Sequence, residues 1–151
     1  MIQKKEATEK KAVLTVAELM AAAARTAPKG CGIDNLEILL VTDSEKDRLA
    51  EKMREIGKDR GIDFFVRDGY CVDASGVVVL IGTRIKPIQC PNCGYCGYAD
   101  CNENRASNGV CSFNTGDLGI AIGSAVSVAA DHRCDNRVLF SAGKAAGVVT
   151  Y

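Results

Sequence analysis

The chain has 151 residues, 47% of them hydrophobic and 25% charged, and its 19 lysines and arginines balance its 19 aspartates and glutamates. This length fits one domain, 1–151, with a core that needs neither disulfides nor a metal merely to fold. A neutral chain gives no electrostatic reason to expect nucleic acid or an anionic membrane as partner. No apolar run approaches the roughly 18 residues of a membrane helix, and no signal peptide is visible, so we expect a cytoplasmic protein.

The N-terminal part of the chain predicts a helix followed by a tight loop. Met1–Lys11 carries four lysines and two glutamates, which is typical of a solvated helix face. The apolar residues that follow recur at helical spacing over 12–27. Pro28 ends this helix, because the residue before a proline is pushed out of helical geometry. Gly30-Cys31-Gly32 then forms a predicted loop.

The middle of the chain predicts short strands around one charged helix. Leu36–Val41 is an apolar run of the length of a buried strand. Ser44 is a candidate cap for a helix over 45–60, and Gly61 lies just beyond its end. An Asp-Gly turn signal and runs of β-favouring residues predict further strands at Phe64–Val66, Tyr70–Val72 and Val77–Ile81.

The last third of the chain predicts a cysteine-rich loop, 89–114, and two more helices. Asp117 is expected to cap an apolar helix that reaches about residue 130, and a final helix is expected over 137–146. Helices interleaved with strands indicate an α+β domain whose mixed sheet is covered by helices. The ending, 147–151, is abrupt, as if a closing element were lacking.

Five of the eight cysteines fall within 22 residues, at Cys90, Cys93, Cys96, Cys101 and Cys111. In a reducing compartment, clustered thiols more often bind metal or do redox chemistry than form disulfides. Thiolates are soft ligands that suit iron–sulfur clusters, zinc and copper(I). A glycine follows Cys93 and Cys96, which lets the chain take positive φ, wrap a centre closely and aim amide N–H groups at sulfur.

Three kinds of site compete for this segment. Structural zinc also uses C-x2-C turns, but a zinc ribbon needs two such turns about 15–20 residues apart, and this chain has one C-x2-C-x2-C run. A disulfide framework does not suit the expected compartment. A [4Fe–4S] cluster is the commonest partner of four thiolates and is favoured. The remaining cysteines, Cys31, Cys71 and Cys134, are by default buried thiols without a ligand role.

The four ligands form either a compact or an extended set. The compact set contains Cys90, Cys93, Cys96 and Cys101, and the extended set replaces Cys90 by Cys111. The stretch from Asn92 to Cys101, NCGYCGYADC, resembles the four-cysteine [4Fe–4S] domain of corrinoid iron–sulfur proteins and of the B subunits of electron-transport complexes. That resemblance implies the ligands Cys93, Cys96, Cys101 and Cys111. Cys90 stays the alternative fourth ligand, because the last spacer is shorter than usual in that domain.

A wider resemblance covers nearly the whole chain. It rests on the cysteines and on three further stretches, ARTAPKG at 24–30, DLGIA at 117–121 and DNR at 135–137. The chain thereby resembles the uncharacterised "ferredoxin domain-containing protein" family. Membership would imply cluster binding and would supply no reaction.

A weaker similarity concerns the helix over 117–130 and the Ala-Pro loop near Pro28. Both are similar to the flavin-binding nitroreductase fold, whose members are usually dimers with FMN at the interface. The similarity implies that Arg25, Lys29 and Cys31 lie near a flavin. The arginine pair typical of the flavin phosphate site has no counterpart in Met1–Lys11, which argues against FMN itself.

The apolar helix over 117–130 carries small residues on one face, because Gly119, Gly123 and Ser127 recur every four residues. Small residues let another backbone approach closely, so the helix is either the centre of a monomer core or the seam of a homodimer.

These patterns predict a [4Fe–4S] protein with an electron-transfer or redox-sensing role and an unidentified redox partner protein. One alternative is an FMN-dependent oxidoreductase that the cluster supplies with electrons. The other is a binding module stabilised by zinc. The sequence holds no Ser/His/Asp constellation, no H-E-x-x-H zinc site and no P-loop, so we assign no catalytic residues.

Overall fold

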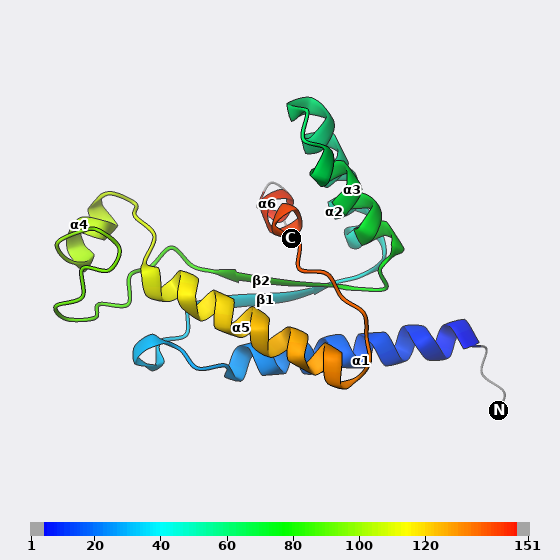
Figure 1. The fold of residues 1–151 in the computed structure, drawn as a ribbon, viewed down its shortest axis with the longest axis horizontal. Helices are drawn as coiled ribbons and strands as arrows, with labels where there is room; N and C mark the ends of the chain where they lie inside the picture. Colours follow the sequence, from blue (N-terminus) through cyan, green and yellow to red (C-terminus); the bar gives the residue numbers. More distant parts are fainter. Residues whose placement is uncertain (1–4, 148–151) are drawn as a thin grey trace.

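A computed structural model describes residues 5–147, so most of the predicted ending 147–151 lies outside the described residues. The chain forms three layers with a narrow sheet in the middle (Figure 1). One face of the sheet is covered by two long helices, α1 (Lys5–Thr26) and α5 (Ser112–Asp131). The other face is covered by α2 (Asp43–Arg60), α3 (Asp63–Ala74) and α6 (Phe140–Ala146).

The sheet consists of β1 (Leu36–Val41) and β2 (Val78–Thr83). The two strands pair antiparallel, from Leu36 opposite Thr83 to Val41 opposite Val78. The α+β class is therefore confirmed, while the expected mixed sheet is an antiparallel pair throughout the described part of the chain. Sequence analysis placed β1 at its observed bounds from its apolar run, but the strand is not buried throughout, since Leu39 and Leu40 are 48% and 38% exposed.

The predicted strands Phe64–Val66 and Tyr70–Val72 are wrong, since both lie in α3. The buried residues of this segment are Phe65, Asp68, Gly69 and Val72, which is the spacing of one helix face. The Asp-Gly pair that reads as a turn has a packing role instead. The Asp68 carboxylate accepts a hydrogen bond from the Ser141 hydroxyl at 2.6 Å, and a Cβ on Gly69 would lie 2.9 Å from the Ala50 carbonyl oxygen.

Two separate cores hold the layers together. Leu49, Met53, Val72 and Ala142 are buried between α2, α3 and α6. On the other side of the sheet, a second core joins α1 and α5 to β1 through Ala24, Leu36, Ala121 and Ala125. Buried apolar side chains of this size contribute about 1.5–3 kcal/mol each for Leu, Met and Val, so burial fixes the body of the molecule.

Helix boundaries differ from the prediction where long-range contacts decide them. The charged helix begins at Asp43 with Thr42 at its N-cap position, so the predicted cap Ser44 is wrong. The helix ends before Gly61, whose φ of 65° confirms the predicted C-terminal glycine. The apolar helix begins at Ser112, earlier than predicted, so Asp117 lies inside it and does not cap it. The two carboxylate oxygens of Asp117 accept a hydrogen bond from the Gly30 amide at 3.0 and 3.1 Å. This contact joins the first part of α5 to the loop after α1.

One face of α5 is buried and the opposite face is open. Ala121, Ala125 and Ala129 are buried, whereas Gly119 and Gly123 meet nothing within 4 Å of the positions that their Cβ atoms would take. Residues 5–147 therefore leave one face of this helix uncovered, and the homodimer seam remains a prediction. Within residues 5–147, no helix combines the length and apolarity that crossing a membrane requires.

Candidate metal centre

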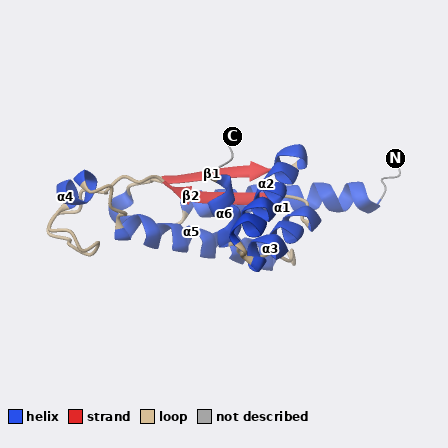
Figure 2. Cartoon of the chain, turned by 90° about the horizontal axis from the view of Figure 1, so that it is seen from above, coloured by secondary structure: helices blue, strands red, loops and turns tan. Residues whose placement is uncertain are grey.

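The cysteine-rich segment leaves the body of the molecule as a separate lobe. After β2 the chain runs out through residues 84–111, which we call the cysteine lobe, before it returns as α5. Figures 1 and 2 both place this lobe, with its short helix α4 (Cys101–Ala106), at one end of the molecule, away from the helices that cover the sheet.

Two buried amides hold the ends of the cysteine lobe at the sheet. The Asn35 side chain donates to the Lys86 carbonyl at 3.1 Å and to Asn114 Oδ1 at 3.0 Å. The Asn114 side chain donates in turn to the Arg84 and Lys86 carbonyls at 3.2 and 2.8 Å. The chain entering the lobe and the chain leaving it are therefore joined directly to the residue before β1. Sequence analysis missed both asparagines, which are 79 positions apart.

Cys101 is fixed by a reciprocal cap at the start of α4. Asp100 Oδ1 accepts the amides of Asn102 and Glu103, each at 2.8 Å. Glu103 Oε2 accepts the Ala99 amide at 2.6 Å. This arrangement is similar to a capping box, with Asp in place of Ser or Thr and with the glutamate bonded to the amide one residue before the cap, and it orients the first turn of the helix. The Asp-x-x-Glu spacing is a sequence signal that could have predicted α4.

The turns around Cys93 and Cys96 depend on left-handed backbone. Gly94 and Gly97 have φ of 68° and 83°, and Asn92 between Cys90 and Cys93 has φ of 52°. The Gly97 amide donates to the Gly94 carbonyl at 3.0 Å and closes the turn between the two cysteines. The predicted positive φ at both glycines is confirmed, and it bends the chain round the space that the cysteines face.

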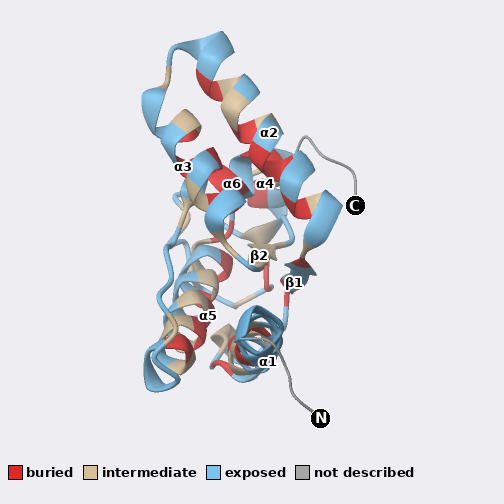
Figure 3. Cartoon of the chain, turned by 90° about the vertical axis from the view of Figure 1, so that its right-hand side faces the viewer, coloured by how far each residue is buried: buried red, intermediate tan, exposed pale blue. Residues whose placement is uncertain are grey.

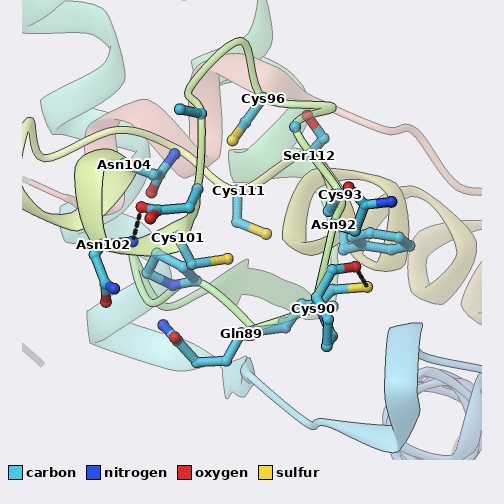
Figure 4. Close-up of a pocket in the computed structure, with 17 residues that line it drawn as sticks. Gln89, Cys90, Asn92, Cys93, Cys96, Cys101, Asn102, Asn104, Cys111 and Ser112 are labelled. Atoms are coloured by element: carbon cyan, nitrogen blue, oxygen red, sulfur yellow. Dashed lines mark hydrogen bonds between the residues drawn. The ribbon is translucent and has the colours of Figure 1, made fainter.

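All five clustered cysteines line one cavity of about 170 Å³. In Figure 4, Cys96, Cys101 and Cys111 surround this space with their sulfur atoms directed into it. Cys90 lies at its border, where its Sγ is 3.9 Å from the Pro91 carbonyl oxygen. The structure thus brings together every candidate ligand from the sequence, and Cys71 and Cys134 are not part of the cavity wall.

Burial and neighbouring thiols both raise the pKa of Cys90. Burial raises the pKa of its thiol, and a hydrogen bond with Cys31 and the charges of Cys31, Cys93 and Cys101 raise this pKa further. Cys31 therefore lies beside Cys90, although sequence analysis placed it near a flavin. Several thiolates gathered in one place repel one another, so the cluster of cysteines suits a cationic centre that neutralises them.

The donor set fits an iron–sulfur cluster. Among residues 5–147, no three His, Cys, Asp or Glu side chains are arranged to hold a single metal ion. Thiolates are the usual ligands of iron–sulfur clusters, and five cysteines line this one cavity. Asn104 in the cavity wall is fully buried, and its Oδ1 has no hydrogen-bond partner in the described chain.

The proposed flavin residues have structural partners at the end of α1. Arg25 donates to Asp34 Oδ2 at 2.7 Å and to the Leu36 carbonyl at 2.9 Å. Lys29 donates to the Arg25 carbonyl and, at 2.9 Å, to the Ala27 carbonyl. Burial would raise the pKa of Asp34, but Arg25, the Leu36 amide and the Lys29 charge outweigh it and hold that pKa below its usual value. A flavin role for Arg25, Lys29 and Cys31 stays a prediction.

Comparisons with known proteins find a family profile and a relative that match this chain. The profile of the family described as "Uncharacterized protein containing a ferredoxin domain" matches residues 107–151, which include Cys111, α5 and α6. An uncharacterized protein of Archaeoglobus fulgidus is 39% identical over 142 residues, which cover 89% of this chain and 77% of the relative. No solved structure matches the chain.

Proposed function

The chain belongs to the family of uncharacterized proteins containing a ferredoxin domain, and from this membership we propose that it binds one [4Fe–4S] cluster and transfers single electrons. The observation that carries the proposal is the cavity lined by five cysteines in a lobe of its own. When bound, such a cluster takes up and releases one electron at a time. The reducing conditions that free thiols need favour a cytoplasmic location.

The ligands we assign are Cys93, Cys96, Cys101 and Cys111. Glycine turns present the first two, the cap of α4 orients the third, and the fourth is buried directly before α5. Cys111 stands at the N-terminal end of a 20-residue helix, where the helix dipole favours negative charge on a thiolate or on a bound cluster. Cys90 is the extra thiol, because its sulfur contacts the neighbouring carbonyl.

The surroundings of the cavity suit exchange of electrons with another protein. The rings of Phe113 and Tyr95 pack edge to face, with their centroids 6.2 Å apart. Tyr98 packs so closely on Gly109 that a Cβ atom on Gly109 would lie 2.5 Å from the Tyr98 ring. Tyr98 therefore covers the lobe on one side, while Tyr95 is 78% exposed. Such an exposed position of the lobe shortens the path between a cluster and the redox partner protein that we expect.

Reduction under anaerobic conditions tests the proposal. Protein purified without oxygen should show a broad brown absorbance that bleaches with dithionite, together with the EPR signal of a reduced [4Fe–4S]⁺ centre. A colourless protein that holds zinc and gives no EPR signal would instead support the zinc-stabilised module. A flavin released on denaturation, identified by its fluorescence, would support the FMN-dependent oxidoreductase.

A further inference from the structure

Two cysteines near the cavity have no role in the proposed cluster. Cys31 is exposed, so it is not the buried thiol that the sequence predicts, and Cys90 is half-buried in the cavity wall. In Figure 4 the Cys90 sulfur lies apart from the three sulfurs that are directed into the cavity. The assignment of the four cluster ligands therefore leaves both of these thiols free to react.

The loop that carries Cys31 is held against the wall of the cavity. It follows α1, which runs beside α5 in Figures 1 and 3, and Figure 1 places it at the end of the molecule where the cysteine lobe begins. A Cβ atom on Gly30 would lie 2.7 Å from the Phe113 ring and 3.3 Å from Ile88 Cδ1, and both of these residues line the cavity. Because glycine has no Cβ atom, it lets the loop approach the wall this closely.

A tight turn presents Cys31 at the surface. The Gly32 amide donates to the Lys29 carbonyl at 3.0 Å, and the Ile33 amide donates to the Gly30 carbonyl at 3.1 Å. Between these two bonds, Cys31 has a φ of 53°, a left-handed conformation that is uncommon for a residue other than glycine. The turn thus fixes the backbone of an exposed thiol that another molecule can reach.

The thiols of Cys31 and Cys90 are neighbours although the residues are far apart in the sequence. Burial is the largest cause of the raised pKa of the Cys90 thiol, and a hydrogen bond with Cys31 is the next. Such a hydrogen bond requires the two sulfurs to lie close together. An exposed thiol next to a more buried one is the arrangement in which the second thiol resolves a mixed disulfide that forms on the first.

We propose that Cys31 and Cys90 form a dithiol centre that exchanges with the disulfide of another molecule. The Cys31 thiolate attacks one sulfur of that disulfide, so that a mixed disulfide forms and the other sulfur leaves as a thiolate. The Cys90 thiolate then attacks Cys31 Sγ, which forms the Cys31–Cys90 bond and releases the second sulfur. The substrate gains two electrons and the two protons that the cysteines lose, and becomes two thiols. A dithiol reductant restores the pair by the reverse exchange.

This inference rests on the proposed function in one respect, because Cys90 is free to react only if Cys111 is the fourth cluster ligand. Exposure sets the order of the two steps. Cys31 meets the substrate first because it lies at the surface, and Cys90 follows because it is half-buried behind it. The substrate class is accordingly a disulfide that is accessible to solvent, in a small molecule or in a protein.

Peptide mass mapping of the cluster-loaded chain after incubation with glutathione disulfide tests the proposal. Protein prepared without oxygen should give a cross-linked peptide that joins Cys31 to Cys90, and dithiothreitol should remove the cross-link. Cys90→Ser should stop at a mixed disulfide between Cys31 and glutathione, because no second thiol resolves it. Cys31→Ser should form neither product.

Cys134→Ser is the matched control, because Cys134 is also half-buried but lies outside the cavity wall. It should form the Cys31–Cys90 cross-link to the same extent as the unaltered chain. The disulfides of insulin, offered in a separate reaction, distinguish the two sources of substrate. A cross-link with insulin alone indicates a protein substrate, and a cross-link with glutathione disulfide indicates that a small molecule suffices.

The iron content of the same samples separates this inference from the proposed function. A cluster-loaded, unaltered chain that forms no Cys31–Cys90 bond with either disulfide overturns the dithiol centre and leaves the cluster in place. Loss of iron from Cys90→Ser also overturns it, because Cys90 is then a cluster ligand. A cross-link in a chain that holds no iron would support the dithiol centre and contradict the cluster. The unaltered chain decides the outcome if a serine variant fails to fold.

Discussion

The body and the cysteine lobe of this molecule are held together by different forces. The body has two apolar cores, one on each face of the sheet. Of the 28 residues of the lobe, only Pro87, Ile88, Asn104 and Cys111 are buried. The lobe is ordered instead by capping bonds, left-handed turns and the two asparagines at its base. A bound cluster would supply the cross-links that a core supplies elsewhere.

The largest expected effect comes from the ligands. Cys93→Ser, Cys96→Ser, Cys101→Ser and Cys111→Ser should each lose most of the cluster, because a serine oxygen is a poor substitute for a thiolate at iron. Cys90→Ser is the matched control and should keep most of it. The ratio of iron to protein after anaerobic purification measures how much cluster each variant keeps. If Cys111→Ser keeps the cluster and Cys90→Ser loses it, the fourth ligand is Cys90.

Removal of the cluster should destabilise the cysteine lobe and leave the body folded. Because the body has its own cores, iron chelation under reducing conditions should abolish protection of the amides in 93–111 and leave those of α2 and α5 nearly unchanged. Hydrogen exchange of the treated and untreated protein measures this difference. Equal loss of protection in α2 would mean that the cluster stabilises the whole domain, and that the comparison between lobe and body is wrong.

The asparagines at the base of the lobe should matter less than the ligands. Asn114→Ala removes one bond to Asn35 and two to backbone carbonyls, and leaving buried polar groups without partners costs about 1–3 kcal/mol. Chemical denaturation should show this loss, together with faster release of iron. Asn136→Ala, at an exposed position outside the lobe, is the control. Unchanged iron release in Asn114→Ala would contradict an anchoring role.

The smallest expected effect distinguishes two glycines. Gly97→Ala should destabilise the lobe by about 1–2 kcal/mol, since φ there is 83° while space for a methyl group is free. Gly119→Ala, inside α5 and facing open space, should instead stabilise the protein by about 0.5–1 kcal/mol. Urea unfolding of both variants compares them. Destabilisation by Gly119→Ala would indicate close packing on that face of α5 and would support the face as a dimer seam.

Sequence alone predicted the elements whose causes are local. Leu36–Val41, the end of α2 at Gly61 and the turns after Cys93 and Cys96 follow from neighbouring residues, and the structure has all of them. The Asp68-Gly69 pair misled because its partners, Ser141 and Ala50, come from distant helices. The link between Asn35 and Asn114 likewise exists only once the sheet and α5 are assembled. The contact between Cys31 and Cys90 is also long-range, so neighbouring residues give no signal for it.

Native mass spectrometry of protein isolated without oxygen tests the central claim most directly. Each chain should carry the additional mass of one unit of four iron and four sulfide, and Cys90→Ser should carry the same unit. Chains that carry no added mass, or the mass of one zinc ion, would contradict a cluster in the cysteine lobe.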